Sequence, residues 1–372
     1  MLKLPGNAEQ FLDRYWQKEP LLVPAALARI QPAVTRNELA WLATLDDVES
    51  RIVFTQREDN GVRYSAETGP FETDYLAALP KRDWTLLVHD VEKHLPAMRR
   101  LFRHVPFVPD WRIDDLMVSF AAPGGGVGPH RDNYDVFLCQ GIGSREWHVS
   151  CAEIAHDPTA SDDLALLAPF SGQPHTVHEG DVLYLPPGVA HWGTATRACM
   201  TYSIGMRAPQ LSDLYPEWHG DQGQDLFYAD PDLSADESIP GYLSPASLTR
   251  VADLTGPGLD PDRAAQALGC HVTETKAWLS PERANHEEAA AILGAAGEPP
   301  RLAVHGMARI AWDDRNIYAN GAFMARGRIS AKWLETLCST RELPALPGID
   351  GSTSECVDWM LRMGVFELPE NS

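Results

Sequence analysis

A histidine and an aspartate separated by one residue, His130 and Asp132, follow a run rich in glycine. Alternate residues of a β-strand point to the same face, so this spacing lets an imidazole and a carboxylate converge on one point. A second histidine, His191, follows residues 181–188, which read as a strand closed by a Pro-Pro-Gly turn. Two histidines and one carboxylate form the facial triad that leaves open positions on Fe(II). We therefore predict that these three residues bind iron.

The glycines at 124, 125, 126 and 128 raise the alternative of a phosphate-binding loop. Neither G-x-x-x-x-G-K-[ST] nor G-x-G-x-x-G fits, because no lysine follows and Pro129 occupies the last glycine position. We expect instead a flexible lip whose backbone approaches a ligand. The other histidines nearby lack a carboxylate at ligand spacing, and core or surface roles are predicted for His148, His156, His175 and His178.

The elements that must position the triad read as β-structure. Between Ile113 and Met206, short apolar or alternating runs are separated by glycine and proline turns, as a sandwich or barrel requires. Before this region, amphipathic patterns at 8–16 and 86–102 mix with strand-like pieces such as 51–54. We expect helices and strands that flank a β core.

Two segments of different composition and predicted secondary structure follow the β core. Residues 207–300 carry 16 acidic and 5 basic side chains, and helices are predicted at 262–268 and 286–296. The remainder, 301–372, reads in the order of a winged-helix module, with strands at 302–310, 316–319 and 365–368 and helices at 331–338 and 354–363. With 8 basic and 9 acidic side chains, this segment lacks the net positive charge that DNA binding requires.

Composition narrows the functional classes. A chain of 372 residues with 44% hydrophobic residues predicts two or three globular domains. Its net charge of −21 disfavours direct binding to nucleic acids or anionic membranes, and it favours a basic protein partner. No apolar run reaches the roughly 20 residues that span a bilayer, and no signal peptide is evident, so we expect a cytoplasmic protein. Six scattered cysteines without a CxxC pair are expected to be reduced.

Five segments resemble one known family: RIDDLMVSF, PGGGVGPHRDNYDVF, QGIGSREW, GDVLYLPPGVAH and YSIGMRAP. They are similar to the bacterial JmjC ribosomal oxygenases, which hydroxylate an arginine of a large-subunit ribosomal protein with Fe(II), 2-oxoglutarate and O₂. The resemblance implies a mainly β catalytic core, a double-stranded β-helix or cupin-like jelly roll. A helical dimerisation segment and an α+β winged-helix C-terminal domain are implied to follow. The implied domains are 1–206, with a core at about 90–206, then 207–300 and 301–372.

The resemblance also implies the site. The positions of the family's iron ligands are occupied by His130, Asp132 and His191. Arg145 matches the basic residue that binds the distal carboxylate of 2-oxoglutarate, and a planar guanidinium suits this task because it pairs bidentately with a carboxylate. The sequence departs from the family's pattern at Met206 and Thr201. Neither position is a metal ligand.

One face of a predicted strand carries Asp115, Met117 and Ser119. A carboxylate in an apolar cavity is costly unless a cation pairs with it, and a substrate guanidinium would be that cation. Tyr134, on the strand face of the first ligand, is placed to stack on the same guanidinium or hydrogen-bond to it. A register shift of one residue would turn Asp114 inward in place of Asp115.

Three functions are compatible with these residues. The first is arginine C3 hydroxylation in a basic large-subunit ribosomal protein, by a homodimer assembled through the segment after Arg207. The second uses the same iron and 2-oxoglutarate chemistry, but it hydroxylates a histidine or removes a methyl group. The third is a non-catalytic module for ribosome assembly or interaction. An acidic residue at 115 favours the first, because a neutral imidazole would not need it.

Overall fold

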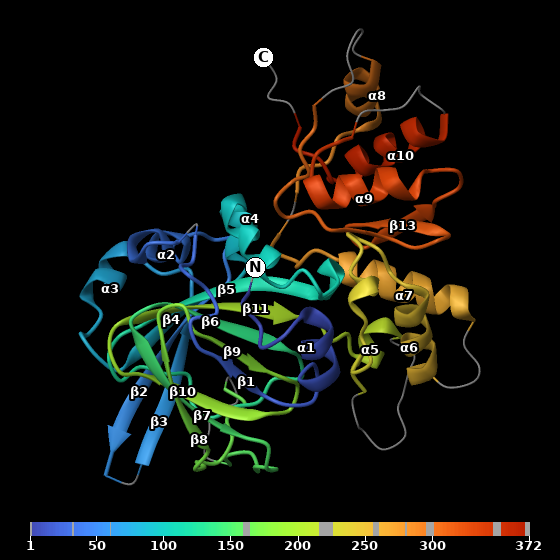
Figure 1. Ribbon diagram of the computed structural model, residues 1–372. Coiled ribbons are helices and arrows are strands. Elements are labelled where there is room, and N and C mark those ends of the chain that lie inside the picture. Colours follow the sequence, from blue (N-terminus) through green and yellow to red (C-terminus); the bar gives the residue numbers. More distant parts are fainter. Residues whose placement is uncertain are drawn as a thin grey trace. The chain divides into compact units, whose positions relative to one another are not determined.

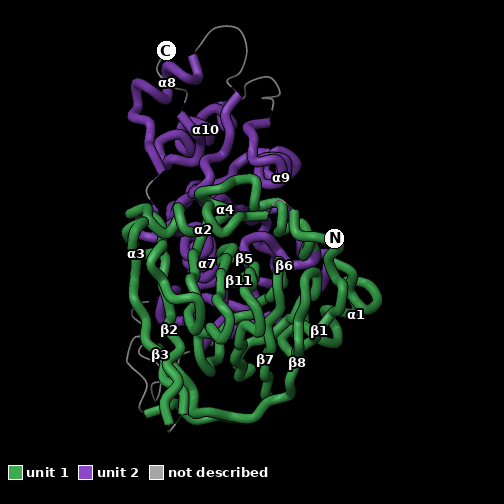
Figure 2. The backbone as a smooth tube through the Cα atoms, turned by 90° about the vertical axis from the view of Figure 1, so that its left-hand side faces the viewer, with its two compact units in different colours: residues 1–106, 113–206, 231–233 green, residues 107–112, 207–230, 234–372 purple. Residues whose placement is uncertain are grey.

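The computed structural model describes residues 2–31, 33–59, 61–158, 164–215, 226–255, 260–279, 281–294, 301–344 and 351–368. The chain divides into two compact units (Figure 2). Unit 1 comprises Met1–Pro106, Ile113–Met206 and Pro231–Leu233, and unit 2 comprises Phe107–Arg112, Arg207–Asp230 and Ser234–Ser372. Among the residues in these described ranges, no helix is long and apolar enough to cross a membrane.

Two antiparallel sheets build unit 1 (Figure 1). The larger has the order β1-β9-β6-β11-β5-β4-β2-β3, with β1 at Leu21–Val23, β9 at Val182–Leu185, β6 at Val136–Ile142, β11 at Cys199–Met206, β5 at Ile113–Ala121, β4 at Trp84–Val88, β2 at Ser50–Glu58 and β3 at Gly61–Thr68. The smaller has the order β10-β7-β8, with β10 at Ala190–Ala195, β7 at Ser144–Ser150 and β8 at Gln173–His178. Spatial neighbours such as β9, β6 and β11 are far apart in sequence, as in a jelly roll. The predicted mainly β core is confirmed.

Short helices flank these sheets: α1 at Ala8–Arg14, α2 at Arg36–Leu42, α3 at Thr73–Ala78, α4 at Val91–His94 and the 3₁₀ helix η1 at Pro96–His104. Capping boxes begin α1 and α2, where Asn7 and Thr35 each accept from the backbone three residues on. The amphipathic pattern at 8–16 is helical, as predicted. The pattern at 86–102 is wrong as a single element, because its first residues belong to β4, whose five side chains are all buried.

The interior between the two sheets is apolar. Its core consists of Val136, Leu138, Trp147, Val149, Val177, Leu183, Leu185 and Val189. Along β7 the side chains alternate, so that Arg145, Trp147 and Val149 are buried while Glu146 and His148 are partly exposed. Arg145 therefore points into the interior together with two apolar neighbours. This alternation places a charged side chain in an otherwise apolar interior.

The glycine run connects the two sheets through its backbone. The Gly124 N–H donates to the Ala195 carbonyl at 2.8 Å, and the Ala195 N–H donates to the Gly125 carbonyl at 2.9 Å. A Cβ atom at Gly125 would lie 2.1 Å from the carbonyl oxygen of Trp84. The expected flexible lip is therefore wrong for this position, because the glycine permits a close approach of its own backbone to that of β4.

Replacing Gly125 with alanine is expected to lower the free energy of unfolding by about 2–4 kcal/mol, because the new methyl group meets backbone that cannot rotate away. Gly294→Ala is the matched control, since a Cβ there has no neighbour within 4 Å, and a change below about 1 kcal/mol is expected. Urea unfolding measures both. Equal stabilities for the two variants would contradict the close approach.

Unit 2 combines helices with a small antiparallel sheet. Its helices are η2 at Asp110–Arg112, α5 at Leu211–Leu214, η4 at Ala235–Glu237, α6 at Pro245–Thr255, α7 at Pro261–Thr273, α8 at His286–Gly294, α9 at Ala331–Thr340 and α10 at Gly351–Arg362. The sheet has the order β12-β13-β14, with β12 at Ile310–Trp312, β13 at Asn316–Ala319 and β14 at Ala322–Ala325. One core gathers Leu243, Val251, Leu268 and Val272 around α6 and α7. A second packs Trp333, Leu334, Val357 and Met360 of α9 and α10 against the sheet.

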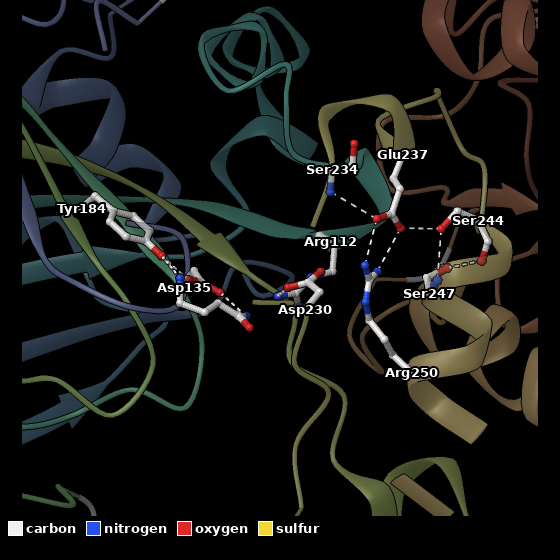
Figure 3. Close-up of polar contacts among 10 residues, drawn as sticks. Arg112, Asp135, Tyr184, Asp230, Ser234, Glu237, Ser244, Ser247 and Arg250 are labelled. Carbon is white, nitrogen blue, oxygen red and sulfur yellow. Dashed lines mark hydrogen bonds and ion pairs between the residues drawn. The ribbon is translucent and has the colours of Figure 1, made fainter. Parts of the chain in front are cut away.

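Two ion pairs order the helical part of unit 2 (Figure 3). Arg112 is fully buried and donates from Nε and Nη2 to the two carboxylate oxygens of Asp230, at 2.9 and 3.1 Å. Arg250 on α6 makes a similar fork with Glu237, with both N–O distances at 2.9 Å. Bidentate pairing compensates the cost of removing these charges from water. Part of the acidic excess in this segment is therefore structural.

Several predicted elements of the C-terminal region differ from the structure. The strand predicted at 302–310 is interrupted by a turn at Gly306, and β12 begins only at Ile310. The predicted closing strand at 365–368 is a single bridge between Val304 and Phe366. Both helices predicted after residue 330 are present as α9 and α10. Within the acidic segment 207–300, residues 221–225 lie outside the described residues.

Candidate active site

Backbone hydrogen bonds bring the predicted metal ligands together. His191 lies on β10, and its N–H and carbonyl exchange hydrogen bonds with those of His130 at 2.8 and 2.9 Å. The Gly188 N–H donates to the Asp132 carbonyl at 2.8 Å. The turn before β10 is thus tied to the His-x-Asp segment at two points. Residues 61 positions apart in sequence therefore face each other.

The imidazole rings are oriented by the residues that precede them. Nδ1 of His130 lies 2.9 Å from the Gly128 carbonyl, and Nδ1 of His191 lies 3.0 Å from the Val189 carbonyl. A carbonyl only accepts, so each Nδ1 carries the proton and each Nε2 keeps its lone pair. Nε2 of His191 lies 3.7 Å from Oδ2 of Asp132. Outer hydrogen bonds of this kind are typical of metal-binding histidines.

The electrostatics of the triad suit a divalent cation. One ligand atom from each of His130, Asp132 and His191 lies within 4.8 Å of the others. Burial, together with the neighbouring His130, lowers the pKa of His191 to about 4. The imidazole is therefore neutral at pH 7, which is the form that binds metals. Two imidazole nitrogens and one carboxylate match the donor set for Fe(II), so these residues fit the metal predicted from the sequence.

Arg145 is a buried cation whose surroundings suit an anionic ligand. It lies on β7 opposite Ala195 of β10, and only 3% of its surface is exposed. Within the described part of the chain, its Nε and Nη2 have no hydrogen-bond partner. Its guanidinium carbon lies 5.3 Å from the ring centroid of Trp147, which shields one side from water. A carboxylate of a bound ligand would satisfy both nitrogens in a bidentate pair.

Three further polar side chains are buried in unit 1, and of these Ser119 and Thr201 were named from the sequence whereas Gln140 was not. Register pairs Thr201 of β11 with Ser119 of β5 and Gln140 of β6, and all three are buried. The Thr201 hydroxyl donates to Oε1 of Gln140 at 3.2 Å. The alternation of side chains along the strand from Asp115 to Ser119 was the sequence signal for the inward position of Ser119. The departures from the family's pattern at Thr201 and Met206 are therefore both buried positions of β11.

Asp115 faces the interior from β5. It lies opposite Gly205 of β11 in the row that also contains Met117, and it is 7% exposed. Its Oδ2 accepts hydrogen bonds from Nδ1 of His89 at 3.1 Å and from the Asp90 N–H at 3.3 Å. The predicted register therefore places Asp115, rather than Asp114, in this row. Sequence reasoning missed His89, which lies 26 residues earlier.

Tyr134 approaches this carboxylate, and Met117 lies two residues further along β5. A Cβ atom at Gly205 would lie 3.2 Å from Oδ1 of Asp115 and 4.0 Å from Cε2 of Tyr134, so these two side chains converge on the glycine. Loss of hydration and the carboxylates of Asp132 and Asp115 raise the pKa of Tyr134 well above its ordinary value. The phenol is therefore protonated, and its hydroxyl donates a hydrogen bond to the carboxylate of Asp132. Met117 packs with the apolar cluster around Val53.

The remaining histidines of the β region stand apart from the triad, as predicted. His148 stacks on Trp192 on the outer face of the small sheet, with ring centroids 4.1 Å apart, and it contacts Glu146 at 3.0 Å. His156 forms a bridge with Leu167 in a loop. His175 and His178 lie on the edge strand β8. Among the side chains that the structure describes, the convergent metal-ligand set is the triad alone.

Comparisons with known proteins agree with this geometry. Residues 100–214 match the family described as JmjC domain. The chain is 37% identical over 262 residues to the ribosomal protein uL16 3-hydroxylase of Escherichia coli K12, which covers 68% of this chain and 67% of that protein. The X-ray structure of E. coli YcfD matches 99% of both chains with a TM-score of 0.73 and 30% identity. A structure of YcfD, described as a ribosomal oxygenase in complex with cobalt and 2-oxoglutarate, matches with a TM-score of 0.70, 29% identity and 99% coverage of both chains.

Proposed function

The chain belongs to the bacterial JmjC-domain ribosomal oxygenases, and from this premise we propose that it hydroxylates C3 of an arginine in a large-subunit ribosomal protein. The reaction uses Fe(II), 2-oxoglutarate and O₂. One oxygen atom enters the arginine and the other enters succinate, and CO₂ is released. Two observations carry the proposal. The first is the His130, Asp132 and His191 triad. The second is buried Arg145, whose Nε and Nη2 have no hydrogen-bond partner among the described residues and whose neighbour Trp147 contacts both its guanidinium and the ring of His191.

Iron with bound 2-oxoglutarate supplies the oxidising power to functionalise an unactivated C–H bond, which no amino-acid side chain has. The chain's own residues bind and orient. Arg145 binds the distal carboxylate of 2-oxoglutarate, which fixes the direction from which its 2-oxo acid end approaches the triad. The apolar core around Trp147 and Leu138 excludes water from this part of the interior. Positioning is the protein's main contribution.

The substrate side of the site is acidic, which fits an arginine. Asp115 offers a buried carboxylate, and Tyr134 offers a protonated phenol at the same place. A guanidinium would pair with the first and hydrogen-bond to or stack on the second. A neutral imidazole would leave the carboxylate of Asp115 without a cation, so histidine is the less suitable target. Met117 completes the pocket with an apolar contact to the alkyl chain of the substrate.

The other parts of the chain are assigned from the same premise. Residues 207–300 form a dimerisation segment, and residues 301–372 form a winged helix that contacts protein rather than DNA. The net charge of −21 attracts the free, basic ribosomal protein in the cytoplasm and repels RNA-rich assembled ribosomes. Modification therefore precedes assembly, and raising the salt concentration weakens substrate capture more than it slows the chemical step.

The direct test incubates the protein with Fe(II), 2-oxoglutarate, O₂ and arginine-containing peptides from large-subunit ribosomal proteins. We expect one peptide to gain the mass of one oxygen atom, with the oxygen located on an arginine by fragmentation. Succinate must form in equal amount. Turnover of 2-oxoglutarate without any oxidised arginine would contradict the assigned substrate. No co-substrate-dependent turnover at all would favour a binding module.

A further inference from the structure

The segment after β4 crosses the beginning of β5. Pairing between these strands ends at Val88 and Val118, and His89 and Asp90 follow directly. Asp90 has a left-handed backbone, with φ at 55°, which turns the chain into α4. Beyond Val88 the chain no longer pairs with β5, and the turn contacts β5 through the hydrogen bonds to Asp115 and Leu116 instead. The turn therefore determines how the first residues of β5 are held.

Asp115 has one oxygen engaged from behind and one directed towards the substrate. Oδ2 accepts from Nδ1 of His89 at 3.1 Å and from the Asp90 N–H at 3.3 Å. Oδ1 is the oxygen that lies 3.2 Å from a Cβ built on Gly205, on the side where Tyr134 also converges. The two oxygens thus have different tasks. Rotation of the carboxylate would exchange them, and His89 opposes that rotation.

The turn itself is anchored well enough to act as a support. The His89 N–H donates to the Glu49 carbonyl at 2.9 Å. Lys93 and Asp90 form a buried ion pair, with 4% and 1% of their side chains exposed. Oε2 of Glu92 accepts from the Leu116 N–H at 2.9 Å, which fixes the turn to the residue next to Asp115. Together these bonds fix the backbone from which the His89 side chain extends.

We propose that His89 is a positioning residue that selects arginine, because it holds Asp115 with Oδ1 aimed at the substrate guanidinium. This inference rests on the proposed function and extends it to a residue outside the substrate pocket. Nδ1 donates and adds no formal charge while the imidazole is neutral, so the negative charge of Asp115 remains available to the substrate. Without the imidazole, the carboxylate samples several rotamers, and ordering one of them costs affinity at each binding event.

His89→Ala is expected to raise the KM for the arginine peptide about tenfold, because the loss of one hydrogen bond to a charged group weakens binding by about that factor. The kcat at saturating peptide and the KM for 2-oxoglutarate should change less than about twofold. His89→Asn should restore the peptide KM, because the amide nitrogen occupies the place of Nδ1 and also donates. His148→Ala is the matched control on the outer face of β7 and should leave both constants unchanged.

Discrimination between an arginine peptide and its citrulline analogue supplies a second readout, because citrulline keeps the shape and removes the charge. The native enzyme and His89→Asn should prefer arginine, and His89→Ala should lose most of that preference. Unchanged peptide KM and unchanged preference in His89→Ala would overturn the inference, as would a His89→Asn variant that folds and is as impaired as His89→Ala. Native enzyme that turns over 2-oxoglutarate but oxidises no arginine would instead overturn the proposed function.

Discussion

Replacing Asp132 with alanine is expected to reduce hydroxylation by more than about 100-fold, since loss of even an outer-shell partner of a metal typically costs 10- to 100-fold. Asp132 is the only anionic member of the triad, so its loss removes the charge that attracts a divalent cation as well as one donor atom. His130 and His191 retain their backbone hydrogen bonds, and the protein should remain folded.

Two assays report this effect independently. Succinate formation measures turnover, and metal content after dialysis measures whether Fe(II) is held. Glu146→Gln is the control, because that carboxylate lies on the outer face of β7 with 46% of its side chain exposed. Near-native turnover and metal content in Asp132→Ala would refute the ligand assignment.

The second large effect concerns Arg145, where function and stability should change in opposite directions. Arg145→Met removes two charge-assisted hydrogen bonds to a carboxylate and is expected to raise the KM for 2-oxoglutarate by roughly 100-fold or more. The same change removes a buried cation whose Nε and Nη2 have no partner in the described chain. Without co-substrate, the variant should therefore be more stable than the native protein by about 1–3 kcal/mol.

A second buried arginine provides the matched control. Arg112 is 0% exposed, like Arg145 at 3%, but its guanidinium pairs with Asp230. Arg112→Met leaves that carboxylate buried without its cation and should cost about 3–5 kcal/mol of stability. Chemical denaturation of both variants without 2-oxoglutarate separates the two cases. If Arg145→Met is as destabilising as Arg112→Met, Arg145 is structural, and its role as an anchor for 2-oxoglutarate is wrong.

The sequence predicted the parts of the site that depend on local spacing. The spacing of His130 and Asp132 and the turn before His191 predicted that the three residues converge. The strand expected through Asp132 and Tyr134 is wrong, because residues 131–135 lie outside the strands and a single bridge between His130 and His191 brings the ligands together. Asp115 was also predicted to face inward from the alternation along its own strand. Arg145 is different, because its role came from resemblance to a family. Its physical support is burial with no hydrogen-bond partner for Nε and Nη2 among the described residues.

The parts that sequence could not predict depend on which strands become neighbours. His89 reaches Asp115 only because β4 pairs with β5, and no local pattern encodes that pairing. Thr201 and Gln140 meet through the pairing of β11 with β6. The glycine run was misread for the same reason, because its close contact is with the backbone of Trp84 on a strand about 40 residues earlier.

The most direct test of the central claim is the intact mass of ribosomal proteins from cells that contain this chain or its Asp132→Ala variant in place of the native protein. We expect one large-subunit protein to be heavier by one oxygen atom, on an arginine, only with the native chain. Identical masses in both cells under aerobic growth, or an added oxygen on a histidine instead, would contradict it.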